Sequence, residues 1–156
     1  GFAIYDTLFK SMAKQHSVAV IIAAAIALLF AWYMGEHLGF SKRAIYIHVA
    51  GLFGTCMAAN VWMRIWPAQQ RIITAIKNGE APDGADVALA GSRSKHNTYM
   101  SLPLFWAMMG QHTTYFAGGN LGLSVSTYWI GWLLIIALGW HIIFHCYKKA
   151  AKLEGF

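Results

Sequence analysis

The chain has 156 residues, of which 58% are hydrophobic and only 12% are charged, and its formal net charge is +6. A soluble domain carries roughly 25% charged residues, so this composition argues against a soluble domain and for a protein surrounded by lipid. The basic residues flank apolar segments and do not alternate with aromatic residues, which argues against nucleic acid as a partner.

All predicted elements are helical. Four apolar residues within 1–16 share one helical face, as in a helix that lies in the membrane interface, although an ordinary polar lead-in explains this segment equally well. These residues are Tyr5, Leu8, Phe9 and Met12. Four apolar segments follow, and each is long enough to cross the hydrocarbon core of a bilayer. The predicted spans cover residues 17–38, 43–66, 98–116 and 127–147.

The connections between the spans have their own signals. Pro67 is expected to end the second span, because proline lacks the backbone N–H that a helix interior requires. Residues 67–79 predict a short interfacial helix, and either Asp83 or Asp86 is expected to cap the helix that leads into the third span. The segment 117–124 predicts the turn before the last span.

The basic residues are distributed unequally between the two ends of the spans. Ten Lys and Arg residues flank one end, and only Lys42 and Arg43 flank the other. The positive-inside rule places both termini and residues 67–93 on the cytoplasmic side, and we expect the bacterial inner membrane. The predicted fold is therefore an all-α integral membrane four-helix bundle over residues 1–156, with short interfacial helices on the cytoplasmic side.

Seven histidines are the main functional candidates, because ionisable groups are costly inside a membrane. His48 on the second span and His112 on the third are expected at one depth near the outer face. Two imidazoles on facing helices are the usual way to bind a b-type haem. Gly51 and Thr55 follow His48 on the same helical face, and their small side chains leave room for a porphyrin.

A second set of histidines lies near the cytoplasmic ends of the spans. His96 opens the third span, and its expected partner at an inner haem is either His141 or His145 on the fourth. His96 and His112 are about 24 Å apart along one helix axis, so a single helix can serve two haems and carry electrons across the membrane. Arg93 is a candidate partner for a haem propionate, although a flanking cytoplasmic charge explains it more simply.

Two other interpretations of these residues stay open. His16 and His37 are expected to reach the interface or to hydrogen-bond a neighbouring helix, as single interfacial histidines usually do. Copper(I) handling is an alternative site chemistry, because thiolate and thioether ligands favour that ion, whereas methionine is also a common packing residue. Its candidate ligands are Cys56, Met57, Met108 and Met109.

Residues 92–116, SRSKHNTYMSLPLFWAMMGQHTTYF, resemble the signature region of the membrane-bound urate hydroxylase family. Residues 62–83 and the helix that begins at His48 are similar to that family as well. The resemblance implies a membrane domain that takes part in urate oxidation and passes electrons onward. It also marks His48, His96 and His112 as functional positions. The family's membrane domain is longer and is often fused to a C-terminal cytochrome c, which these residues do not include.

The interpretation that combines these patterns is a subunit that binds one or two haem b groups and transfers electrons within a larger membrane redox complex. A quinone or a c-type cytochrome is the expected redox partner. The alternatives are a urate-oxidising membrane hydroxylase and a non-catalytic structural subunit. The polar residues available for a purine are not expected to lie at one depth. They are Asn60, Arg64, Asn97, Gln111 and Thr113.

Overall fold

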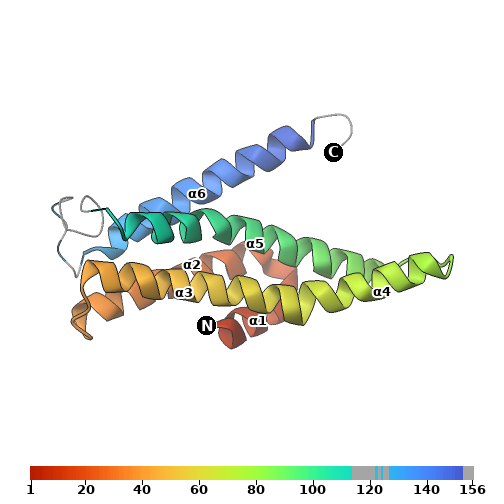
Figure 1. Ribbon diagram of the computed structural model, residues 1–156, viewed down its shortest axis with the longest axis horizontal. Helices are drawn as coiled ribbons and strands as arrows, with labels where there is room; N and C mark the ends of the chain where they lie inside the picture. Colours follow the sequence, from red (N-terminus) through yellow and green to blue (C-terminus); the bar gives the residue numbers. More distant parts are fainter. Residues whose placement is uncertain (114–121, 123, 125–126, 153–156) are drawn as a thin grey trace.

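The computed structural model describes residues 1–113, 122, 124 and 127–152, and these residues form helices and no strand. The all-α prediction is therefore confirmed for the described residues. The helices are α1 (Phe2–Ser11), α2 (His16–Glu36), α3 (Lys42–Asn60), α4 (Trp66–Lys77), α5 (Gly84–Gly110) and α6 (Trp129–Ala150), with a 3₁₀ turn at Ala13–Gln15 and a π-helical turn at Val61–Ile65 (Figure 1).

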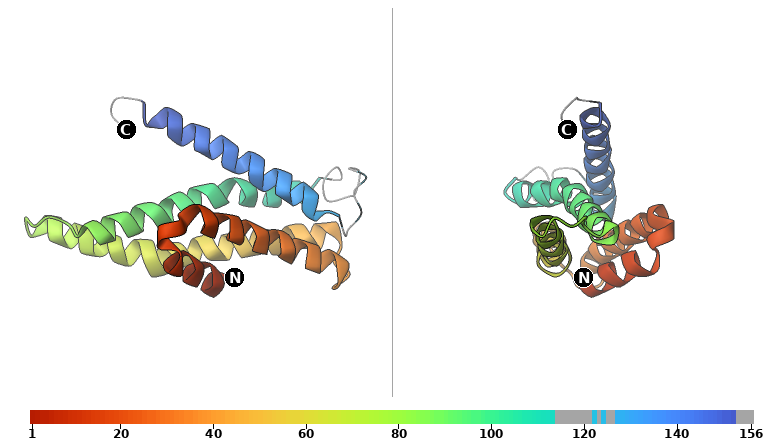
Figure 2. Two further views of the ribbon diagram at one scale, coloured as in Figure 1. Left: turned by 180° about the vertical axis from the view of Figure 1, so that it is seen from behind. Right: turned by 90° about the vertical axis from the view of Figure 1, so that its right-hand side faces the viewer.

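The long helices alternate in direction (Figures 1 and 2). The turn between α2 and α3 lies at one end of the molecule, which we call the turn end, together with the start of α6. The junction of α4 with α5 lies at the opposite end, which we call the α4–α5 end. Helix α1 lies beside α2 and α3, and α6 leans away from the other helices toward its C-terminal end.

Among the residues that the structure describes, three helical segments are long and apolar enough to cross a membrane: Ala13–Glu36, Lys42–Lys77 and Trp129–Ala150. Their outer faces carry exposed apolar side chains, such as Ile21 at 67% and Leu134 at 65% exposure, as expected where lipid is the solvent. Helix α5 differs, because its first half carries charged and polar residues. A fourth crossing by α5, and with it the membrane four-helix bundle, stays a prediction.

Pro67 does not end the helix that contains the predicted second span, and where that span ends in the membrane stays a prediction. Helix α3, the π-helical turn and α4 form one continuous helix of 36 residues, Lys42–Lys77. The N–H of Trp66 bonds to the carbonyl of Val61, five residues earlier, so the backbone is widened directly before the proline, where its ring would otherwise clash with the preceding turn. This helix is about 54 Å long and extends past a hydrocarbon core of about 30 Å.

The boundaries of α5 also differ from the prediction. Helix α5 ends at Gly110, so residues 114–116 of the predicted third span and most of the predicted turn 117–124 lie outside the described residues. At its start, the Asp83 side chain accepts a hydrogen bond from the N–H of Ala85 at 2.8 Å and caps the helix. Asp86 instead binds Arg71, which decides between the two predicted caps.

Close contacts fix the helices against one another at the turn end. The rings of Tyr46 and Trp132 are 4.9 Å apart and both side chains are buried, which joins α3 to α6. Helix α6 lies close to α5 at Gly139, where an added Cβ would lie 3.3 Å from both Leu102 Cβ and Pro103 Cδ. Beyond this contact α6 diverges, which leaves space toward the α4–α5 end.

Candidate functional site

Helix α1 is fastened to the long helices by an ion-pair cluster around Asp6, which is 7% exposed. Its Oδ1 accepts hydrogen bonds from Arg64 Nε at 2.9 Å and from Arg93 Nη2 at 3.0 Å, and Lys10 Nζ lies 3.0 Å from Oδ2. The Arg64 guanidinium, more than any other neighbour, holds the pKa of Asp6 well below its usual range. Asp6 is therefore ionised and bridges three cations at neutral pH.

Arg93 is 3% exposed and its charge faces α1. Besides the pair with Asp6, its guanidinium carbon lies 5.1 Å from the ring centre of Tyr5 and 5.9 Å from that of Phe9. Cations stack favourably on aromatic faces at this separation. The carboxylate partner of Arg93 in the structure is Asp6, and a haem propionate as a further partner stays a prediction.

A chain of amide and phenol groups lies next to this cluster. Asn97 Nδ2 donates to the carbonyl of Met57 at 3.1 Å, and Asn60 Nδ2 donates to Asn97 Oδ1 at 3.0 Å. Asn60 Nδ2 also donates to the Tyr5 hydroxyl at 2.8 Å. Asn60 on α3 and Asn97 on α5 therefore lie at one level. Gln111 lies after the other end of α5, so the polar residues considered for a purine do not all converge.

The chain continues from Tyr5 to two histidines. The Tyr5 hydroxyl lies 2.6 Å from His96 Nδ1, and His96 Nε2 lies 3.3 Å from His16 Nε2 on α2. The two imidazole rings are stacked with their centres 5.0 Å apart. His96 is 9% exposed, whereas His16 lies at the surface. The expected hydrogen bond of His16 to a neighbouring helix is thus present.

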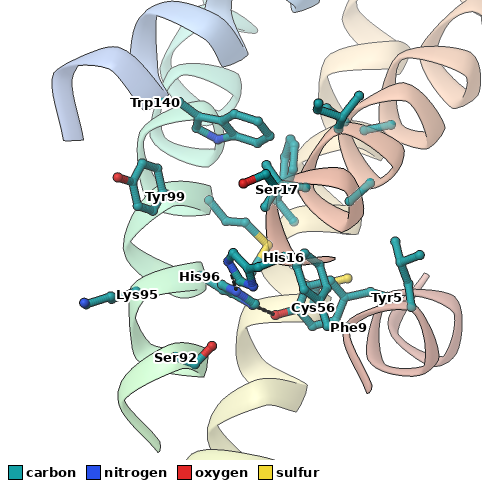
Figure 3. Close-up of a pocket in the computed structure, with 18 of the residues that line it drawn as sticks. Tyr5, Phe9, His16, Ser17, Cys56, Ser92, Lys95, His96, Tyr99 and Trp140 are labelled. Carbon is teal, nitrogen blue, oxygen red and sulfur yellow. Dashed lines mark hydrogen bonds between the residues drawn. The ribbon is translucent and has the colours of Figure 1, made fainter. Parts of the chain in front are cut away.

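The His16–His96 pair lies at one side of a large apolar cavity of about 1190 Å³ (Figure 3). Helices α1, α2, α3, α5 and α6 all contribute to its wall, and Phe9, Tyr99 and Trp140 supply aromatic rings. Figure 3 shows the two imidazoles at the centre of this group of side chains, with Trp140 on the far side. The cavity occupies the space that opens where α6 leans away from α5.

The two candidate ligands on α6 have different surroundings. His141 lines the cavity together with His96, and His145 is not part of its wall. The rings of His141 and His145 are 4.4 Å apart. As a partner for His96, His141 is therefore better placed than His145, which the sequence could not decide.

The second histidine site lies at the turn end. His48 Nδ1 is 2.8 Å from the carbonyl oxygen of Ala44. A carbonyl can only accept, so Nδ1 carries the hydrogen and the lone pair of Nε2 is left free. The ring packs against Phe40 at 4.9 Å, and a Cβ added at Gly51, one turn along, would meet nothing within 4 Å. His48 thus combines a free ring nitrogen with open space on its helix face.

The sequence predicts that His112 lies within the third helix. In the structure His112 is exposed and lies in the turn two residues after the end of α5. Between the described side chains of His48 and His112 there is no hydrogen bond or ring contact. The part of the chain that the structure describes contains no group of three or more side chains placed to bind a metal ion. Joint ligation of an iron by His48 and His112 stays a prediction.

The sequence did not single out Tyr5 and Asp6 as site residues. Asp6 carries a signal that could have found it, because it is the one acidic residue before Glu36 and lies in an otherwise apolar and basic helix. An unpaired acid is expensive at a membrane surface, so a basic partner was to be expected. Tyr5 has no such signal, because it lies on the apolar face of its helix, and contact with lipid explains that face equally well.

Comparison with known proteins places the chain in a family. Residues 1–153 match the family described as urate oxidase N-terminal, and this range includes both histidine sites and all six α-helices. No curated protein and no solved structure matches the chain. The family match agrees with the resemblance seen in residues 92–116, and it covers nearly the whole sequence. The chain therefore belongs to the urate oxidase N-terminal family.

Proposed function

We propose that this chain is a membrane redox domain of a urate-oxidising system, which binds haem b and transfers electrons within or across the membrane. The family match supports the link to urate oxidation, and the three long apolar helices support the membrane setting. The haem proposal rests on His48, because its Nε2 has a free lone pair and the same helix face has open space at Gly51.

The residues around His48 fit an axial ligand of haem. The Ala44 carbonyl fixes the ring through Nδ1, as backbone carbonyls commonly do for histidines that bind a metal. The open space at Gly51 is suited to a flat macrocycle, and His112 is the proposed second ligand. Once bound, haem b supplies one-electron oxidation and reduction. The chain contributes the ligand, its orientation and an apolar surround.

Urate oxidation is assigned here to the whole system and not to a purine pocket in this chain. The polar residues considered for such a pocket mostly bond one another: Asn60 binds Tyr5 and Asn97, and Arg64 binds Asp6. Gln111 lies far from them, just after α5 at the turn end. The proposed partners are other subunits of the redox complex and a quinone or c-type cytochrome, and the proposed location is the bacterial inner membrane with cytoplasmic termini.

The haem proposal is tested on the purified chain in lipid nanodiscs. A pyridine haemochrome assay measures haem b per chain in the natural sequence, in His48→Gln and in His37→Gln. His37 is the control, because it lies at the same end and packs against Trp32 and Tyr33. We expect haem in the natural sequence and in the control, and its loss in His48→Gln with helix content unchanged. A colourless natural protein, or full haem content in His48→Gln, would overturn the proposal.

A further inference from the structure

The donor and the acceptor of each bond in the hydrogen-bond chain at the cavity can be assigned, starting from a backbone carbonyl. The Met57 carbonyl is an obligatory acceptor, so the Asn97 atom that faces it is the amide nitrogen. Asn97 therefore presents its oxygen to Asn60, and Asn60 must present its nitrogen in return. The same nitrogen of Asn60 donates its second hydrogen to the hydroxyl oxygen of Tyr5.

The same assignment continues into the histidines. Tyr5 accepts from Asn60, and its hydroxyl keeps one hydrogen to donate, for which His96 Nδ1 at 2.6 Å is the acceptor. Burial disfavours a charged imidazole at His96, so the ring carries its one hydrogen on Nε2. His96 Nε2 is consequently a donor, and His16 Nε2 accepts from it.

This tautomer disagrees with an iron ligand at His96. A ligating ring nitrogen needs a free lone pair, and in His96 one nitrogen accepts from Tyr5 while the other carries a hydrogen. An inner haem on His96 stays a prediction, but the hydrogen-bond pattern suits a different ligand. It suits a molecule that accepts a hydrogen bond, such as one with a carbonyl group.

The cavity beside the histidines limits the ligand further. Its volume of about 1190 Å³ exceeds the roughly 300–1000 Å³ of sites for drug-sized molecules and is far larger than a single purine needs. Apolar residues of α2 and α6, both able to cross a membrane, line its length, including Val20, Ala24 and Ala137. At the histidine side, the rings of Phe9 and Tyr5 lie 4.3 Å and 5.9 Å from the ring of His96. This shape matches a flat head group with a long apolar tail.

We propose that this cavity is a quinone site, with the head group at the His16–His96 pair and the isoprenoid tail along α2 and α6. A quinone carbonyl accepts the hydrogen bond that His96 Nε2–H now gives to His16. Reduction of the quinone to the quinol takes two electrons and two protons, and each C=O becomes C–OH. The proposed haem, reduced by urate oxidation, would supply the electrons one at a time, and the protons would come from solvent, which exposed His16 contacts. This redox role rests on the proposed function, whereas the binding site does not.

The test measures equilibrium binding of a decyl-substituted benzoquinone to the chain in nanodiscs, with empty nanodiscs as background. Loss of the hydrogen bond from His96 Nε2–H to the head group should weaken binding by about five- to tenfold in His96→Gln. His16→Gln should weaken binding as well, because it removes the ring that lines the cavity beside the head group. His16 is exposed, so its variant is not expected to disturb folding. Tyr5→Phe should weaken binding as well, because it removes the hydrogen that fixes the His96 tautomer. His145→Gln is the control and should bind as the natural sequence does, since His145 lies outside the cavity wall.

Two results would overturn the quinone site: no binding above empty nanodiscs, or equal binding by the His96, His16 and His145 variants. A haem content that falls in His96→Gln would instead assign the cavity to a second haem and would also overturn it. The haem assay on the same samples separates this inference from the proposed function. Quinone binding without haem contradicts only the haem proposal, and haem without quinone binding contradicts only the quinone site.

Discussion

Asp6 on α1 and Arg93 on α5 form an ion pair in which Oδ1 and Nη2 are 3.0 Å apart, and the Arg93 side chain is almost completely buried. The two residues are 87 positions apart in the sequence. This contact makes α1 part of the cavity wall and brings Tyr5 to His96. The ion pair therefore connects the packing of the first helix to the state of the histidine site.

Asp6→Asn is expected to loosen α1. Removing one partner of a buried ion pair typically costs about 3–5 kcal/mol, because the remaining charge stays buried without compensation. Cys56 is 5% exposed and lines the cavity near Gly1, so its reaction with a maleimide should become faster. Exposed Cys146 is the internal reference and should react at an unchanged rate. Mass spectrometry distinguishes the two sites.

The matched control for that substitution is Asp86→Asn. Asp86 pairs with Arg71, whose side chain is 58% exposed, and such surface pairs contribute little to stability. Cys56 should remain as protected in this variant as in the natural sequence. If Cys56 stays protected in Asp6→Asn too, the ion-pair cluster does not fasten α1.

Acid should remove the contribution of Asp6 to stability. The pKa of Asp6 in the folded protein lies below its usual value of 3.8, so the carboxylate stabilises the fold above about pH 4. As the pH falls below this value toward the folded pKa, the contribution is lost. The unfolding temperature of the natural sequence in detergent should therefore approach that of Asp6→Asn between about pH 4 and strongly acidic pH. A constant difference over this range would contradict the assignment.

Gly139 is expected to set the closest approach of α6 to α5. A Cβ at this position already lies within 3.3 Å of Leu102 and Pro103, so Gly139→Leu should destabilise the fold by about 1–3 kcal/mol through overpacking. Thermal unfolding followed by circular dichroism measures the change. Gly51→Ala is the control, because its Cβ meets nothing and alanine favours a helix. Equal unfolding temperatures in the two variants would mean that α6 can shift without cost.

Substitutions at Gly51 test haem binding separately from folding. Gly51→Leu should leave the unfolding temperature close to that of the natural sequence, because the position is open to its surroundings. The same side chain would fill the space below His48 that the macrocycle is proposed to use. We therefore expect haem content to fall to less than half in Gly51→Leu, measured by the haemochrome assay, and to stay unchanged in Gly51→Ala. Full haem content in Gly51→Leu would place the haem elsewhere.

The sequence predicted the helices well where composition alone decides them. Long apolar runs predicted the helical class and four spans, and three of these spans overlap described helices that are long and apolar enough to cross a membrane. The second of these helices continues to Lys77, past the predicted end at residue 66. The sequence did not predict a helix that continues through Pro67, because a proline is an interruption only if the preceding turn is α-helical, and the π-helical turn at Val61–Ile65 has no sequence signal.

The site was less predictable than the helices. Sorting the histidines by depth grouped His16, His96, His141 and His145 near one face, because depth follows from position along a helix. The first three line the cavity, whereas His145 is not part of its wall. The partner of His96 was not predictable, since Tyr5 and His16 reach it only after α1 folds back onto the long helices. The tautomers of the histidines could not be predicted from the sequence. They follow from which neighbours are obligatory acceptors, such as the carbonyls of Ala44 and Met57.

We propose that urate oxidation supplies the electrons that this domain transfers. The most direct measurement is the reduction of its haem b by urate in nanodiscs without oxygen, with the complex purified intact and followed by its absorption spectrum. The account predicts that urate produces the reduced haem b spectrum and that His48→Gln abolishes this change. A haem that dithionite reduces but urate leaves oxidised in the intact complex would contradict it.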